Sequence, residues 1–545
     1  MTIAVYYASD GFRVNKKNIM GRQVAGNTFL KAFFKYTNYS EFYVYSANKI
    51  QAEDFYNFSQ SEGRNEEVKF IDFRHTEALN KPGLLFYPGP DIAFQAKRRS
   101  LFKNSGWSIC GVTHTTASDR IMDSFQSFAT SPIEPWDAVI CTSSAVRSNV
   151  LKIIESEEEN LKQRLNATNF VRPQFPIIPL GVHCSEFQFT DSEKVNARKA
   201  LGIERDEIAI LYVGRLSFHA KANPFPMYKA LEKAAIKSQK KIVLIECGFY
   251  GTKDVENAFK RAFEYLSPSI RAIRINGTDP KLKSQSYAAA QIFCSLSDNV
   301  QETFGITPIE AMAAGLPVVV SDWDGYKDTV RNNVDGFRIP TVMPPPGFGK
   351  DISSRYALSI DNYDKYIGYL SNFISIDIEK TSSVFYELIS NERLRNKMGN
   401  NAKTRAFEKY DWNKIIIKYE NLWSNLKSIR NKSNESYYIW SARLDPFDIF
   451  SSYPSKTISE DSMISLVDES ASLSFLKFKE LKNLNIIKYA NYTIPNEDFV
   501  EKLLKTIEQN TKKHADIRLE FKHINEIYIA RSIIWLNKYH LIKIY

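Results

Sequence analysis

Short apolar runs alternate with amphipathic helical segments along most of the chain, and this alternation restricts the fold more than any other feature of the sequence. Six runs in the first part of the chain have the length of buried strands, at residues 3–7, 41–45, 68–72, 83–87, 108–113 and 138–141. A second series follows at residues 210–214, 241–248, 272–277, 292–297 and 316–322. Strands that alternate with helices favour a parallel sheet with helices on its faces. The sequence therefore predicts an α/β fold with two parallel-sheet domains and a cleft between them.

The length of 545 residues suits about three to four domains. We expect a first Rossmann-like domain at residues 1–190 and a second at 191–427, which ends in closing helices at about 376–406 and 412–426. Residues 340–349 include three successive prolines and are predicted to form a loop. After Lys427 the composition turns polar, and residues 435–545 are predicted to form a separate small α+β module. Its end reads as a helix followed by a short strand, the layout of winged-helix units.

Charge and composition restrict the partners and the compartment. Lys and Arg outnumber Asp and Glu by 72 to 62, which favours nucleic acid, an acidic membrane face or a phosphorylated small molecule. No stretch approaches the roughly 18 apolar residues of a membrane span, and the first residues lack signal-peptide features. We expect a cytoplasmic protein, with peripheral contact at the inner, anionic membrane face as an open option. The five cysteines form no cluster of zinc spacing, so we expect no metal.

The residues with the most informative chemistry lie at 295–325, where a predicted strand ends, a loop follows and a helix begins near Thr307. Ligands bind at the carboxyl ends of the strands in folds of this class. A glycine in the loop allows close backbone approach, and the first N–H groups of a helix suit a phosphate. Glu302 and Glu310 are about two helical turns apart and can hold hydroxyls at two ends of one ligand. The structural alternative is a helix with an N-terminal acid and a solvated glutamate.

This stretch resembles the signature of the family-four retaining glycosyltransferases of the GT-B fold, E-x-F-G-x-x-x-x-E-A-M-A-x-G-x-P-V. The chain reads E-T-F-G-I-T-P-I-E-A-M-A-A-G-L-P-V from Glu302 on, a full match. The resemblance extends over roughly residues 1–425. It implies a GT-B fold with the nucleotide sugar on the second domain and the acceptor on the first. Residues of the stretch expected to contact the substrate are Phe304, Gly305, Ile306, Thr307 and Glu310.

Two further segments match the family in the expected order. Arg215 and Lys221 fill the cationic positions after the first strand of the second domain, where they can neutralise a diphosphate. Two solvated surface cations are the alternative. His114 follows a strand of the first domain and matches a histidine that relatives place near the transferred sugar. Gly21 and Gly26 lie just before or at a helix start and are the nearest match to glycines that contact donor phosphate or acceptor.

The resemblance implies a retaining, metal-independent glycosyltransferase of the hexosyltransferase type. It would use a UDP- or GDP-sugar, no further cofactor, and a glycan or lipid-linked acceptor, in polysaccharide or glycan synthesis. Glu302 would hold the sugar hydroxyls and Glu310 the nucleotide ribose, with His114, Arg215 and Lys221 as the other catalytic residues.

Two other functions compete with this one. The first is a non-catalytic scaffold, or a DNA-binding protein regulated by nucleotide sugars, that acts through the C-terminal module. From Arg430 on there are 17 Lys+Arg against 15 Asp+Glu, so we do not expect nucleic acid as a partner. The module can instead serve as a homo-oligomer contact. An epimerase of the same fold lacks support, because the E-x-F-G block is typical of transferases.

Overall fold

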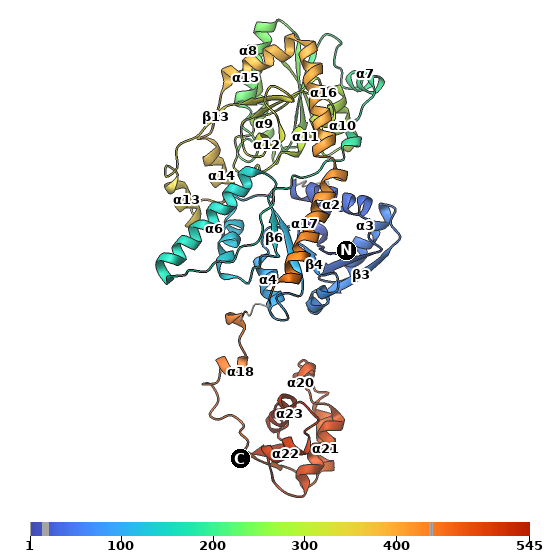
Figure 1. Cartoon of the computed structure of the whole chain (residues 1–545), viewed down its shortest axis with the longest axis vertical. Coiled ribbons are helices and arrows are strands. Elements are labelled where there is room, and N and C mark those ends of the chain that lie inside the picture. The colour runs from blue at the N-terminus through green and yellow to red at the C-terminus, as the bar shows by residue number, and fades with distance from the viewer. Residues whose placement is uncertain (1, 14–20, 435–437, 439) are drawn as a thin grey trace. The chain divides into compact units, whose positions relative to one another are not determined.

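The computed structural model describes the chain apart from residues 1, 14–20, 435–437 and 439. The described residues form two compact units, Met1–Trp440 and Ser441–Tyr545. The first unit contains two six-stranded sheets with helices packed against them (Figure 1). The α/β class and the two parallel-sheet domains predicted from the sequence are confirmed.

The first sheet is parallel throughout, in the order β3-β2-β1-β4-β5-β6. Its strands are β1 (Ala4–Tyr6), β2 (Glu41–Ser46), β3 (Glu67–Asp72), β4 (Leu84–Phe86), β5 (Ser108–Val112) and β6 (Ala138–Ile140). Its helices are α1 (Ser9–Phe12), α2 (Gly21–Tyr36), α3 (Lys49–Ser61), α4 (Ala93–Ser100), α5 (Asp119–Gln126) and α6 (Ser144–Leu165). Ala4 and Val5 are both buried, in separate cores on opposite faces of the sheet. Burial on both faces explains why these strands read as continuous apolar runs.

The second sheet has the order β12-β11-β10-β7-β8-β9 and is also parallel. Its strands are β7 (Ile208–Val213), β8 (Ile242–Gly248), β9 (Arg271–Asn276), β10 (Ile292–Ser295), β11 (Val318–Ser321) and β12 (Gly336–Ile339). Its helices include α7 (Asp191–Ala200), α8 (Phe225–Ser238), α9 (Lys253–Leu266), α10 (Pro280–Ala289), α11 (Ile306–Ala313) and α12 (Tyr326–Thr329). The sequence analysis missed β12, a short edge strand that begins with a glycine.

The long helical stretch predicted at about 376–406 is helical but divided by a break. Two helices occupy this region, α15 (Ile378–Ser390) and α16 (Glu392–Lys409). They are separated at Asn391, whose side chain accepts a hydrogen bond from the Leu394 backbone N–H at 2.9 Å and caps α16. An asparagine that caps a new helix competes with continuation of the preceding one.

The last helix of the first unit, α17 (Trp412–Lys432), packs on the first sheet rather than the second. Its Trp412 and Tyr419 rings lie 6.0 Å and 5.5 Å from the ring of Phe29 on α2. Near its end, Arg430 is buried and donates a hydrogen bond to the Gly83 carbonyl. The chain therefore returns to the first domain before the first unit ends, and α17 contributes aromatic side chains to the core of that domain.

An insertion at residues 340–376 follows β12. It consists of β13 (Thr341–Val342), α13 (Lys350–Ala357), α14 (Tyr363–Ser371) and β14 (Ser375–Ile376), and β13 pairs antiparallel with β14. The three prolines lie between β13 and α13, outside any helix or strand, as predicted.

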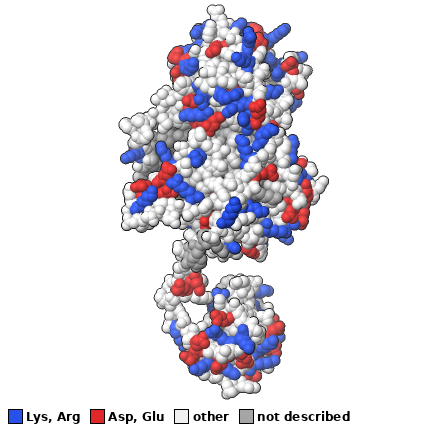
Figure 2. Space-filling view, in the orientation of Figure 1, with Lys and Arg blue, Asp and Glu red and all other residues white. Residues whose placement is uncertain are grey.

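The second unit has its own apolar core, which includes Phe478, Leu503 and Trp535. Its elements are α18 (Pro446–Ile449), β15 (Met463–Leu466), α19 (Ala471–Leu481), α20 (Asn485–Lys488), α21 (Glu497–Glu508), β16 (Lys512–Lys513), α22 (His514–Glu520), α23 (Glu526–Lys538) and β17 (Ile542–Ile544). The sheet is antiparallel, in the order β16-β15-β17. The expected final helix and short strand are α23 and β17. The other two strands of the sheet, β15 and β16, were not predicted. Figure 2 shows charges of both signs interspersed on its visible face.

Candidate active site

Two loops lie together at the carboxyl ends of β7 and β10 in the second domain. Three hydrogen bonds to the backbone of the first loop join them. Ser297 Oγ donates to the Lys221 carbonyl at 3.2 Å, Asn299 Nδ2 donates to the His219 carbonyl at 2.7 Å, and the Asn223 N–H donates to Asp298 Oδ1 at 3.2 Å. The loops therefore hold the cationic segment 214–224 against the acidic segment 296–305. This is the edge of a parallel sheet where ligands bind.

Glu302 and Lys221 form an ion pair between these loops, with Lys221 Nζ 3.4 Å from Glu302 Oε2. The Glu302 side chain is only 17% exposed, and it also accepts a hydrogen bond from the Thr303 N–H at 3.3 Å. Burial raises the pKa of Glu302, but Lys221 and the backbone N–H groups of Thr303 and Phe304 outweigh it and lower the pKa below its usual value. Glu302 is therefore a charged carboxylate at neutral pH.

Arg215 lies two residues after β7, and one of its terminal guanidinium nitrogens (Nη2) donates to Gln301 Oε1 at 3.3 Å. Gln301 precedes Glu302 in the same loop. The structure thus brings Arg215, Lys221 and Glu302 onto two neighbouring loops. A planar guanidinium and a mobile ammonium so placed can bind a diphosphate.

Gly305 lies at the start of α11 with φ of +82°, a conformation that favours glycine. A Cβ at this position would lie 2.0 Å from the Tyr326 ring, so no other residue fits. Ile306 and Thr307 begin the helix, where backbone N–H groups have no acceptor within the helix and can bind an anion. Phe304 was expected to contact the substrate, but its ring is buried in the core of the second domain. There it lies 6.3 Å from the Tyr410 ring and points away from the polar groups of the loop.

Glu310 lies further along α11, and donors from α10 contact both of its carboxylate oxygens. Lys283 Nζ is 2.9 Å from Oε1, and the Tyr287 hydroxyl donates to Oε2 at 2.6 Å. The Glu310 side chain is 8% exposed. Each carboxylate oxygen has a second lone pair, so these contacts fix the carboxylate and leave acceptor capacity for ligand hydroxyls. Sequence analysis did not find Lys283 or Tyr287, because a separate helix supplies them.

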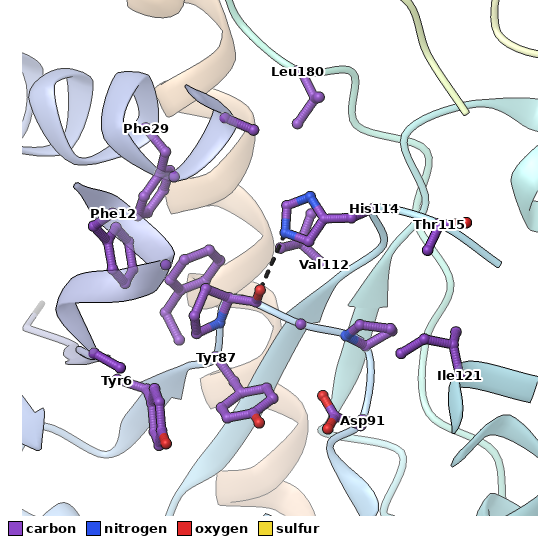
Figure 3. Close-up of a pocket in the computed structure, with 18 of the residues that line it drawn as sticks. Tyr6, Phe12, Phe29, Tyr87, Asp91, Val112, His114, Thr115, Ile121 and Leu180 are labelled. Atoms are coloured by element: carbon purple, nitrogen blue, oxygen red, sulfur yellow. Dashed lines mark hydrogen bonds between the residues drawn. The ribbon is translucent and has the colours of Figure 1, made fainter. Parts of the chain in front are cut away.

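His114 lines a pocket of about 390 Å³ in the first domain. Figure 3 shows its ring directed toward the Pro88 carbonyl, which lies 3.1 Å from Nε2. The wall is largely aromatic and apolar, with charged groups among its lining residues: Tyr6, Phe12, Phe29, Tyr87, Val112, Ile121 and Leu180, with Asp91 and Arg120. Arg120 pairs with Asp91 at 2.8 Å. A pocket of this size with few polar groups is typical of small-ligand sites.

The two predicted glycines differ in position. Gly21 is the first residue of α2, and it is not among the residues that line this pocket. Gly26 does line it, but it lies inside α2 rather than at a helix start, which corrects the prediction. A Cβ at Gly26 would lie 2.3 Å from the Gly11 carbonyl oxygen. Gly26 therefore permits the close packing of α1 on α2, and the segment 14–20 between them lies outside the described residues.

The loops of the two domains are hydrogen bonded to each other around this site. Thr303 Oγ1 donates to the His114 carbonyl at 2.5 Å. At the N-terminus of α6, the Ser144 N–H and hydroxyl donate to the Asp328 carboxylate at 2.6 and 2.7 Å. An acid from the second domain thus caps a first-domain helix. In the sequence, Asp328 is only an aspartate that follows the E-x-F-G block, and nothing there indicates Ser144 as its partner.

Two buried acids in this region predict how stability depends on pH. Burial raises the pKa of Asp298 to about 7, and burial together with the charge of Glu302 raises the pKa of Asp324 to about 7. Their ordinary value is 3.8, so between about pH 4 and 7 the folded protein holds protons that the unfolded chain has released. These groups therefore make the ligand-free protein less stable as the pH rises through that window.

We expect the melting temperature of the ligand-free Asp298→Asn variant to fall less over this pH window than that of the wild-type protein, because the amide does not titrate. Melting curves at a series of pH values measure the difference. Asp191→Asn, which changes an exposed acid on α7, is the matched control and should follow the wild-type slope. An unchanged slope in Asp298→Asn would show that Asp298 titrates normally in the folded state.

The sequence of this chain is similar to those of known glycosyltransferases. Residues 193–344 match the family model described as Glycosyl transferases group 1. An uncharacterized glycosyltransferase of Methanocaldococcus jannaschii is 24% identical over 52% of this chain and 59% of its own length. The lipopolysaccharide 1,2-N-acetylglucosaminetransferase of Salmonella typhimurium is 21% identical over 46% of this chain and 56% of its own length. The chain thus spans less than two thirds of these relatives.

The fold is similar to that of Anabaena HepE, whose structure contains UDP and glucose. The match has a TM-score of 0.51 at 12% identity and covers 78% of this chain and 100% of the other. In the described part of this chain, no helix is long and apolar enough to cross a membrane, and no three His, Cys, Asp or Glu side chains gather as metal ligands would. The chain has the GT-B fold, and its residues 193–344 are similar to the group 1 glycosyl transferases.

Proposed function

We propose that the protein is a retaining glycosyltransferase that moves a sugar from a nucleotide-diphosphate sugar to a glycan or lipid-linked acceptor. The observation that carries the proposal is the Lys221–Glu302 pair at 3.4 Å beside the glycine-led start of α11. In this pair, the Lys221 ammonium would stabilise the leaving diphosphate, and the Glu302 carboxylate would stabilise a cation-like sugar carbon. The match of residues 193–344 to the group 1 glycosyl transferases supports the same chemistry.

Transfer from such a donor builds negative charge on the leaving diphosphate. Arg215, Lys221 and the first N–H groups of α11 would stabilise that charge, an effect that is largest in a site with little water. Glu310, held by Lys283 and Tyr287, would accept hydrogen bonds from the ribose hydroxyls. In the retaining reaction, the acceptor would attack from the face that the diphosphate leaves. A diphosphate oxygen would then take the acceptor proton, and no metal would be required.

The acceptor would occupy the first-domain pocket at His114. Its volume of about 390 Å³ and its aromatic wall suit one or two sugar rings, and the Asp91–Arg120 pair can hydrogen bond to hydroxyls. The Salmonella relative is named a lipopolysaccharide N-acetylglucosaminetransferase, which supports a cell-surface glycan or glycolipid as the acceptor. The excess of 72 Lys and Arg over 62 Asp and Glu supports peripheral contact with an anionic membrane.

Thermal unfolding in the presence of UDP-, GDP- and ADP-sugars tests the donor site. A donor at a hundredfold excess over its Kd should stabilise the first unit by about 2.7 kcal/mol. The melting temperature of the first unit should rise with one nucleotide series and not with the others. Because the second unit can melt separately, its transition serves as an internal reference.

Arg215→Ala should lose most of this rise, and Lys229→Ala, an exposed cation on α8, should keep it. If none of the three nucleotide series stabilises the first unit, the proposal of a UDP-, GDP- or ADP-sugar donor is wrong.

A further inference from the structure

A chain of hydrogen bonds joins Arg215 in the second domain to the His114 loop in the first. Arg215 Nη2 donates to Gln301 Oε1 at 3.3 Å, and Gln301 Nε2 donates to the Tyr363 hydroxyl at 3.1 Å. The Tyr363 hydroxyl lies 3.4 Å from Thr115 Oγ1, and either hydroxyl can donate. Thr115 is the residue after His114 and also lines the first-domain pocket. Each member of the chain therefore orients the next.

Tyr363, which links Gln301 to Thr115 in this series of hydrogen bonds, belongs to the insertion at residues 340–376. The E-x-F-G pattern does not include this insertion. Tyr363 begins α14, and this helix packs across the domain boundary. Ile367 on α14 is fully buried with Ala117 of the first domain and Ala220 of the cationic loop. The insertion thus contacts both the donor-side cations and the acceptor-side loop.

A second tyrosine of the insertion strengthens the same contact. The Tyr356 hydroxyl on α13 accepts a hydrogen bond from the Asp119 N–H at the start of α5, at 3.1 Å. The Tyr356 ring stacks on the ring of Tyr366 at 4.4 Å, so the two insertion helices are joined to each other. The two insertion helices therefore pack on each other, and one of them is hydrogen bonded to the first domain.

The protonation state of Tyr363 allows its hydroxyl to make both of these hydrogen bonds. Burial raises the pKa of Tyr363 above its ordinary value, so the hydroxyl is neutral at physiological pH. A neutral hydroxyl can accept from the Gln301 amide and share its own proton with Thr115. A phenylalanine at this position would keep the ring packing and lose both contacts.

We propose that Tyr363 is a positioning residue that makes the orientation of Arg215 depend on the seating of the first-domain loop 113–118. When that loop leaves, Tyr363 and Gln301 lose their fixed orientation, and Arg215 is no longer held toward the diphosphate. The donor-side site is then complete only while the acceptor-side loop is in place. This role in transfer rests on the proposed function, whereas the mechanical coupling of the two loops does not.

Hydrogen–deuterium exchange of the ligand-free protein tests the coupling directly. Tyr363→Phe should raise exchange in both segments, 113–118 and 299–305, although only one atom is removed from the insertion. Tyr369→Phe, which changes a 40% exposed tyrosine on the same helix, is the matched control and should change neither segment. Faster exchange confined to α14, or no change, would overturn the proposal.

A second arm uses UDP as the probe. In the wild-type protein, UDP should protect segment 213–222 and also segment 113–118, and in Tyr363→Phe only the first protection should remain. If UDP protects neither segment in the wild-type protein, the proposed donor site is wrong, and the ligand-free exchange still decides on the coupling. If UDP protects both segments equally in Tyr363→Phe, the coupling does not pass through Tyr363.

Kinetics with the donor found by thermal unfolding give a readout that general destabilisation would not produce. Tyr363→Phe and Thr115→Val should each lower kcat/KM for the donor about 10-fold, and the double variant should be little worse than either. Multiplicative losses in the double variant would mean that the two residues act independently, which contradicts the proposal.

Discussion

Replacing Lys221 with alanine should lower turnover by at least about 10²-fold, because the developing charge on the diphosphate loses its mobile cation. The melting temperature should change little, since Lys221 lies on a loop with its side chain 33% exposed. Arg215→Ala should give a loss of the same order. Steady-state release of the nucleotide from the donor measures both losses, with Lys229→Ala as a control that should keep wild-type turnover.

Lys221→Ala also removes the ion-pair partner of Glu302. Part of the loss of turnover in this variant therefore comes from the changed environment of the Glu302 carboxylate. Lys221 lowers the pKa of Glu302, so in the Lys221→Ala variant this pKa should be higher than in the wild-type protein. The pH profile of Lys221→Ala should therefore lose activity at a higher pH on its acid side than that of Arg215→Ala, which leaves the Glu302 pair intact. Near-normal turnover in either variant would refute the assignment of the diphosphate to these two cations.

The fold was predictable because both sheets are buried on two faces. The central strands of such a sheet are short apolar runs, and the predicted strands of the first sheet agree with the structure to within one residue at each end. The errors occurred where that signal is weak. The edge strand β12 is short and begins with glycine, and the break between α15 and α16 depends on a single capping asparagine. Propensity alone does not distinguish a polar helix residue from a cap.

The candidate site was predictable only in part, for a different reason. Residues within one loop, such as Glu302 and Gly305, follow from a local pattern. Their partners come from distant segments: Lys283 is 27 positions from Glu310, and Tyr363 is 62 positions from Gln301. No local spacing encodes such contacts, because the topology of the sheet and its insertion creates them. The coupling between the domains therefore became visible only in the folded chain.

Substitutions of Glu302 and Glu310 should change different kinetic parameters. Glu302 is the buried, charged carboxylate nearest the cationic loop, so Glu302→Gln removes a charge that favours a cation-like sugar carbon. Such an interaction strengthens in the transition state, and its loss should lower kcat by about 10²-fold or more with a smaller change in donor KM. Glutamine keeps the size and one acceptor, which limits any change in folding.

Glu310 should instead affect donor binding. Lys283 and Tyr287 hold its carboxylate on α11, where it would accept hydroxyl hydrogen bonds that are the same before and during the reaction. Glu310→Gln keeps an acceptor for Tyr287 but leaves the Lys283 ammonium without its partner, so donor KM should rise about 10-fold while kcat changes less. Initial rates of both variants over a range of donor concentrations separate the two roles. Indistinguishable profiles, or a pure KM effect in Glu302→Gln, would contradict this assignment.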